Sequence, residues 1–218
     1  MKETLLGLLN DIREARAQGP EALIQRQRTR LAEIVAYVRD KSPYYRKLYQ
    51  DLPEHVDDAR LLPVTSKKSL MAHFNDWVTD RSVTIEQVRT FVENPAMVGE
   101  MFQDKYLACI GTGTRGLRGI YLMDNWPGPV YAALTAYQNN VWFPDGELLR
   151  VLTCDGGRAT LVSTSSNFPF HVNTVRRAKN NPRVARKNRI ISVHTPLSEQ
   201  VAQLNEFRPT VLESVLNF

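Results

Sequence analysis

The sequence predicts a mixed α/β fold, in which a mainly helical N-terminal region precedes a region where strands and helices alternate. Apolar residues recur at helical spacing over residues 5–38. After Asn94-Pro95 the apolar runs become short and β-prone, and a glycine-rich segment lies between two of them. We therefore expect a mainly helical region over residues 1–100 and an α/β region over 101–218, packed together as one domain.

Two helices are predicted at the N-terminus. The first ends where Gly19-Pro20 interrupts its pattern, and the second runs to the segment before Pro43. The apolar residues of the first helix are Leu5, Leu8, Leu9 and Ile12. Those of the second are Ile24, Leu31, Ile34, Val35 and Val38. Each set forms one face at helical spacing, which is typical of helices that cover a core.

A short helix is expected after the loop at residues 61–68. Thr65 or Ser66 is the expected N-cap, because a hydroxyl there can accept a hydrogen bond from a free backbone N–H. The capped helix is predicted to span Ser69 to Phe74.

Strands and helices are predicted to alternate in the second half of the chain. Strands are expected at residues 106–110, 120–123, 148–153 and 190–193, each a short apolar run. Pro127 is expected to open a helix whose apolar face is Val130, Leu134, Tyr137 and Val141. A last helix is expected after Thr195-Pro196, with Leu197, Val201 and Leu204 on its apolar face, and should end at Arg208-Pro209.

Several classes of protein are excluded by composition and spacing. The N-terminal stretch lacks the apolar core of a signal peptide, and no apolar run approaches the ~18 residues of a membrane span. Two cysteines, Cys109 and Cys154, suit a reducing compartment and small buried roles, so we expect a cytoplasmic protein that contacts no membrane. The histidines lack metal-ligand spacing, and no nucleophile elbow of the form G-x-S-x-G occurs.

Basic residues are concentrated in one part of the chain, although the net charge is only +5. From Gly156 to Ser198 there is no Asp or Glu. The basic residues of this segment are Arg158, Arg176, Arg177, Lys179, Arg183, Arg186, Lys187 and Arg189. Such a block attracts anions, or it is a solvated face balanced by the acidic stretch at residues 51–104.

The segment from Gly111 to Gly119 has the spacing of several phosphate-binding loops. Gly111, Gly113 and Gly116 match G-x-G-x-x-G, but a strand-like run follows where that motif requires a helix. Gly111 and Gly116 also have the spacing of a Walker P-loop, but the Lys-Ser/Thr pair of that motif is absent. A protein-kinase glycine loop also lies between two strands, but none of the other kinase motifs follows it here. Two readings remain for this segment, a mobile hairpin loop or a loop whose backbone N–H groups hold a polyphosphate.

Four short motifs in order resemble the phenylacetate-coenzyme A ligase branch of the adenylate-forming superfamily. They are Ser42-Pro43-Tyr44-Tyr45-Arg46, Leu62-Pro63-Val64-Thr65-Ser66-Lys67, the glycine-rich segment from Gly111 to Arg118, and Leu204-Asn205-Glu206-Phe207-Arg208-Pro209. In that family the loop T-S-G-T-T-G-x-P lies between two strands and holds the phosphates of ATP. The resemblance therefore implies phosphate binding by Thr112, Gly113, Thr114, Arg115 and Gly116.

The resemblance also implies a reaction and its ligands. A carboxylate would attack the α-phosphate of Mg-ATP, and coenzyme A could then capture the acyl-adenylate. The expected ligands are thus ATP, Mg, a small carboxylic acid and coenzyme A, and no catalytic residue is assigned. Arg115 and Gly111 depart from the family loop, and the family's adenine-binding segment, acidic residue and C-terminal lysine would lie beyond Phe218. We expect the chain alone to be inactive, whether it is the N-terminal part of such a ligase or a relative that has lost catalysis.

Two alternatives without catalysis stay open. One is an anion- or nucleic-acid-binding module that uses the basic run at residues 176–189, although that run lacks the aromatic residues that stack on single-stranded bases. The other is an interaction module, in which a second copy or a partner chain covers an open sheet edge and completes the fold.

Overall fold

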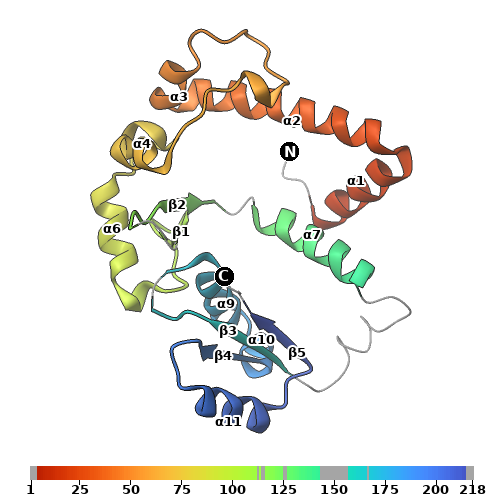
Figure 1. Ribbon diagram of the computed structural model, residues 1–218, viewed down its shortest axis with the longest axis vertical. Helices are drawn as coiled ribbons and strands as arrows, with labels where there is room; N and C mark the ends of the chain where they lie inside the picture. The colour runs from red at the N-terminus through yellow and green to blue at the C-terminus, as the bar shows by residue number, and fades with distance from the viewer. Residues whose placement is uncertain are drawn as a thin grey trace. The chain divides into compact units, whose positions relative to one another are not determined.

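The computed structural model describes residues 4–111, 113, 116–124, 127–142, 157–165 and 167–214. The chain forms two compact units, residues 1–88 and 89–218. Figure 1 shows that helices dominate the first unit, whereas strands occur in the second. The chain is therefore mixed α/β, as the sequence predicts.

The first two helices are separated by a glycine turn. Helix α1 (Leu5–Gln18) begins at Thr4, whose Oγ1 accepts the N–H of Gly7 at 3.1 Å. Gly19 has a φ of 89°, which favours glycine, and Pro20 opens α2 (Pro20–Lys41) with its φ already suited to a helix. Both predicted helices and the predicted break at Gly19-Pro20 are confirmed.

A buried serine joins α2 to the rest of the first unit. Ser42 is fully buried between α2 and α3 (Pro43–Leu48), and its Oγ accepts the N–H of Tyr45. The same hydroxyl lies 3.1 Å from the carbonyl oxygen of Asp76 and 2.8 Å from that of Trp77. It therefore caps one helix and fixes the end of another.

The remaining helices of this region are short. They are η1 (Ala59–Leu61), α4 (Lys67–Ala72), α5 (Phe74–Trp77) and α6 (Ile85–Glu93), and α6 contains the boundary between the two units. Ser66 caps α4 by accepting the N–H of Ser69 at 3.1 Å, as one of the two predicted caps. The prediction that this helix extends to Phe74 is wrong, because the backbone of His73 leaves the helical conformation and Phe74 starts α5.

The core of the first unit lies under α2. Val35, Tyr49 and Val56 are buried together, and further side chains pack on them. These are Leu31, Val38, Tyr45, Leu48, Leu52 and Leu62. The predicted stripe on α2 is thus only partly buried, since Ile24 and Ile34 remain 49% and 57% exposed. Helical periodicity predicts a broad apolar face, but only Leu31, Val35 and Val38 of that face pack against residues 45–62 in this unit.

The second unit begins with a β-hairpin. After η2 (Pro95–Met97), strand β1 (Leu107–Ile110) pairs antiparallel with β2 (Ile120–Met123), from Leu107 opposite Met123 to Ile110 opposite Ile120. All four residues of β1 are buried. Both predicted strands are confirmed, and the glycine-rich segment connects them.

A parallel three-stranded sheet forms the rest of the second unit, in the order β4-β3-β5. Its strands are β3 (Arg158–Val162), β4 (Asn188–Ser192) and β5 (Val211–Ser214), and its helices are α9 (Pro169–Asn180), α10 (Pro182–Lys187) and α11 (Leu197–Phe207). Helices α10 and α11 contact β4, and α9 contacts β1. The prediction of β4 and α11 is confirmed, whereas the patterns do not predict β3, α9 or β5. The strand predicted at residues 148–153 lies outside the described residues.

Two helices of this unit are correctly located but bury less than their patterns predict. Helix α7 (Pro127–Trp142) buries Ala133, whereas Leu134 and Val141 are 46% and 51% exposed. On α11, Leu197 is 75% exposed, and the helix ends at Arg208 in the left-handed conformation. Apolar spacing therefore locates these helices without identifying their buried faces.

Candidate functional site

The glycine-rich segment forms the turn of the β1–β2 hairpin. Gly111 donates its N–H to the carbonyl oxygen of Gly119 at 2.7 Å, which closes the base of the turn. Gly116 donates to the carbonyl oxygen of Gly113 at 2.8 Å. Gly113 and Gly116 have φ values of 61° and 83°, a region that residues with a Cβ adopt at a cost. Thr112, Thr114 and Arg115 lie outside the described residues.

Close packing adds a constraint at two of these glycines. A Cβ on Gly119 would lie 2.6 Å from the Oη of Tyr121, so the tyrosine side chain would have to move. A Cβ on Gly113 would lie 3.0 Å from the backbone nitrogen of Arg118, which is a tight contact with backbone. The turn is therefore compact, and glycine is favoured at both positions.

The hairpin is tied to the sheet at the ends of the parallel strands. The N–H of Ile110 donates to the carbonyl oxygen of Asn167 at 2.8 Å, and Asn167 follows β3. Since the carboxyl ends of parallel strands are where open α/β sheets bind ligands, this tie brings the hairpin next to the edge that a ligand would use.

Hydroxyl groups and one histidine line this edge. Ser163 Oγ lies 2.9 Å from His194 Nε2 and 2.9 Å from Ser165 Oγ, and Thr164 donates to Ser192 Oγ at 3.0 Å. His194 is exposed, and no residue that the structure describes places a carboxylate on its ring. These contacts fix the ends of β3 and β4 and present polar atoms to solvent.

A hollow of about 400 Å³ lies in the second unit beside the base of the hairpin, and we call it the hairpin hollow. Its polar lining residues are Arg89, Glu93, Arg118, Thr164, Ser165 and Asn167. Its apolar lining residues are Val92, Pro95, Val98, Ile110 and Ile120. The volume lies within the range of small-molecule sites. Of the residues predicted to bind phosphate, the two that the structure describes, Gly113 and Gly116, do not line this hollow.

Sequence spacing did not predict a binding role for three of the lining residues, Arg89, Arg118 and Asn167. Arg89 and Arg118 are exposed and form no hydrogen bond or ion pair with any residue in the described ranges. Asn167 is 1% exposed, and its Nδ2 has no hydrogen-bond partner among the described residues. Arg118 could have been identified from the sequence, since it lies within the glycine-rich segment. Arg89 and Asn167 could not, because they are distant from that segment in sequence.

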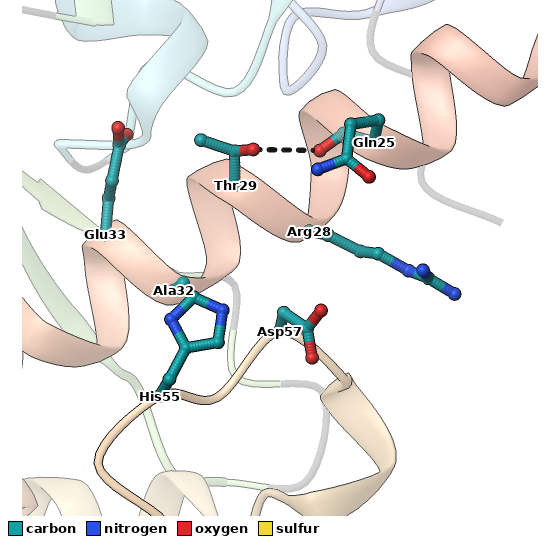
Figure 2. Close-up of a pocket in the computed structure, with 7 residues that line it drawn as sticks. All are labelled: Gln25, Arg28, Thr29, Ala32, Glu33, His55 and Asp57. Carbon is teal, nitrogen blue, oxygen red and sulfur yellow. Dashed lines mark hydrogen bonds between the residues drawn. The ribbon is translucent and has the colours of Figure 1, made fainter.

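A second hollow of about 350 Å³ lies in the first unit, between α2 and the loop that follows α3 (Figure 2). It is lined by Gln25, Arg28, Thr29, Ala32, Glu33, His55 and Asp57. Figure 2 shows Thr29 bonded to the carbonyl oxygen of Gln25 within its own helix, at 3.0 Å. Charges of both signs line this hollow, so it favours no single ligand charge.

The basic segment divides into residues that hold the fold and residues that do not. Lys179 donates to the carbonyl oxygen of Val98 at 2.9 Å and pairs with Glu100, whose pKa it lowers. Arg158 pairs with Glu213, and Arg189 lies over the ring of Phe207 at 5.3 Å. Arg176 donates to the carbonyl oxygen of Gly99 at 3.4 Å. The other four members have no ion pair among the described residues and are exposed; they are Arg177, Arg183, Arg186 and Lys187.

The remaining candidate side chains are structural. Cys109 is fully buried in β1, as predicted, and burial raises the pKa of its thiol to about 12. Cys154 lies outside the described residues. His171 is buried, whereas His55, His73 and His194 are exposed. Within the described ranges, no three His, Cys, Asp or Glu side chains gather as a metal site would require.

Comparison with family models, curated proteins and solved structures finds no match to this chain. The function proposed below therefore rests on the geometry of the site and on the sequence motifs. Among the described residues, no helix combines the length and the apolar character needed to cross a membrane.

Proposed function

We propose that the second unit binds the polyphosphate of a nucleotide on its glycine-rich turn. We further propose that the chain is the N-terminal part, or a catalysis-deficient relative, of an ATP-dependent, AMP-forming acid–thiol ligase. The observation that supports this most is the position of the turn. It connects two paired antiparallel strands and is tied through Ile110 and Asn167 to the carboxyl edge of a parallel sheet.

The backbone of the turn suits an anion. Gly113 and Gly116 adopt left-handed conformations, which favour concave turns that bind anions through backbone N–H groups. The N–H groups of Gly111 and Gly116 are donated within the turn, so the residues between them would supply the free N–H groups. Thr112, Thr114 and Arg115 would add two hydroxyl groups and one guanidinium group to this site. A polyphosphate is the ligand that such a set of donors fits best.

The proposed ligands follow from the family resemblance. Mg-ATP would lie on the turn, a small carboxylic acid would attack its α-phosphate, and coenzyme A could accept the acyl group. Stabilisation of charge in such a transition state needs a metal and several cations acting together. We therefore expect binding of nucleotide by this chain without turnover.

Thermal unfolding with and without Mg-ATP or AMP tests the proposal. Ligand at about 100 times its dissociation constant stabilises by roughly 2.7 kcal/mol, and each kcal/mol raises the midpoint by about 2 to 4 °C at this size. We expect a saturable rise that Thr114→Ala abolishes. Thr29→Ala, an exposed threonine on α2 of the first unit, is the matched control and should keep the rise. An unchanged midpoint at millimolar nucleotide would refute the proposal.

A second candidate function is supported by the exposed basic residues of α9 and α10. Arg177, Arg183, Arg186 and Lys187 are exposed, and no Asp or Glu occurs from Gly156 to Ser198. Guanidinium and ammonium groups that the fold leaves free can bind the phosphates of a polyanion.

Salt dependence tests this second candidate. Four phosphate contacts predict that the logarithm of the association constant for a duplex oligonucleotide falls with a slope of about −3.5 against the logarithm of salt concentration. Fluorescence anisotropy should also show weaker binding for Arg183→Gln/Arg186→Gln. Affinity that is independent of salt, or the same in this double variant, would contradict a role for these residues.

A further inference from the structure

We propose that the hairpin hollow is a binding site for a small organic anion with an apolar body and a single carboxylate group. This proposal does not rest on the proposed nucleotide site, because neither Gly113 nor Gly116 of the glycine-rich turn lines the hollow. Its basis is the composition of the hollow and the state of its two arginines.

The arginines supply the charge. Arg89 lies on α6 and Arg118 lies in the glycine-rich turn just before β2, so two separate elements bring guanidinium groups to one hollow. Neither group is used by the fold, since neither pairs with a residue in the described part of the chain. Guanidinium groups bind carboxylates through paired N–H donors, and they do so most strongly beside apolar walls that exclude water.

The other lining residues provide apolar surface for the body of the ligand and polar groups for its oxygen atoms. Val92, Ile110 and Ile120 are buried residues that line the hollow, together with Pro95 and Val98. Thr164 and Ser165 add hydroxyl groups at the sheet edge. Asn167 adds a buried amide nitrogen without an acceptor among the described residues, and buried donors are normally satisfied. A ligand acceptor near this wall would satisfy it.

Charge balance selects the class of anion. Arg89 and Arg118 contribute two positive charges and Glu93 contributes one negative charge, so the ionisable lining has a net charge of +1. A monoanion is matched by this lining. A dianion would bring its second charge toward Glu93, and unpaired like charges discriminate strongly between ligands.

Isothermal titration calorimetry of the full chain with defined probes tests the site. Hexanoate and benzoate are the monoanions, adipate and phthalate are the matched dianions, and hexanol and benzamide are the neutral controls. We expect saturable binding of the monoanions, binding of the dianions weaker by about tenfold, and no binding of the neutral controls. Equal binding of benzoate and benzamide, or no saturation with either monoanion, would overturn the proposal.

Variants locate the site. Arg118→Gln should weaken benzoate binding by about tenfold to a hundredfold, the usual effect of losing a charged hydrogen bond. Arg118→Lys keeps the charge but lacks the paired N–H donors, so it should lose less affinity than Arg118→Gln. Arg177→Gln, which changes an exposed arginine on α9, should change nothing. Thr114→Ala should leave benzoate binding intact even if it abolishes the nucleotide response, which separates this site from the proposed function. Equal affinity in Arg118→Gln and Arg177→Gln would place the anion elsewhere and refute the assignment.

Discussion

Arg39 in the first unit and Arg118 in the second illustrate two uses of the same side chain. Arg39 donates to four backbone carbonyl oxygens, those of Tyr49 and Leu52 at 2.8 and 3.0 Å and those of Pro53 and Glu54 at 2.7 and 3.1 Å. It therefore holds the loop after α3 against α2. Arg118 lines the hairpin hollow and has no such partner among the described residues.

The difference shows how a structural cation is distinguished from a candidate binding cation. Both residues are charged, and sequence composition treats them alike. Their partners separate them, because carbonyl oxygens already fill the donor geometry of Arg39, whereas the donors of Arg118 remain free for a ligand. Three substitutions and one labelling experiment test which side chains the fold uses, from the largest expected effect to the smallest.

Arg39→Ala should lower the free energy of unfolding by about 3 kcal/mol, because the loss leaves several carbonyl oxygens without their charged donor. Urea unfolding followed by circular dichroism measures the change. Arg13→Ala, an exposed arginine on α1, is the matched control and should change stability by less than about 0.5 kcal/mol. Equal effects of the two substitutions would show that the four carbonyl contacts contribute nothing.

Ser42→Ala should cost about 2 kcal/mol, because it removes the cap of α3 and the buried contact to the end of α5. The same urea titration measures it. Ser66→Ala removes an exposed cap only, on α4, and should cost about 1 kcal/mol. A Ser42→Ala chain no less stable than Ser66→Ala would contradict a central role for the buried hydroxyl.

Cys109 tests whether the strands under the glycine turn form a rigid core. Burial raises the pKa of its thiol from an ordinary value of 9.0 to about 12. The folded state thus keeps this proton longer than the unfolded state, so the contribution of Cys109 to stability is complete below pH 9.0 and is lost as pH rises toward about 12. At pH 8, iodoacetamide should leave Cys109 unmodified until denaturant is added, as peptide mass spectrometry would show. Rapid labelling of native protein at Cys109 would contradict a closed hairpin core.

Arg118→Ala should change the free energy of unfolding by less than about 0.5 kcal/mol, since the fold does not use its guanidinium group. Its effect should appear only in anion binding. Urea unfolding alongside Arg39→Ala measures this contrast directly. A loss comparable to that of Arg39→Ala would mean that Arg118 is structural, and it would remove the basis of the hairpin hollow as a ligand site.

Local sequence patterns predicted the elements that local chemistry determines. Gly19-Pro20 marks the break between α1 and α2, and apolar runs mark β1 and β2. Strand β3 was not predicted, because Arg158 and Thr160 interrupt its apolar run, although Thr160 is fully buried between β4 and β5. Its strand character comes from parallel pairing with residues about 30 and 50 positions away, which single-sequence periodicity does not detect.

The candidate site was predictable only in part for the same reason. The glycine spacing located the turn, and its strand–loop–strand setting is confirmed at Gly111, Gly113 and Gly116. The hairpin hollow depends on contacts across the unit, such as the hydrogen bond from Ile110 to Asn167. No local pattern indicates that Arg89 and Arg118 line the same hollow.

A backbone amide NMR titration with Mg-ATP tests the central proposal most directly, because it reports on the turn itself. If the glycine-rich turn binds the polyphosphate, the amide signals of Gly113 and Gly116 should move saturably, and Thr114→Ala should abolish the movement. Amide signals on α9 and α10 should stay constant. Unchanged glycine signals at saturating nucleotide, or movement confined to α9 and α10, would contradict the account and place anion binding on the basic residues instead.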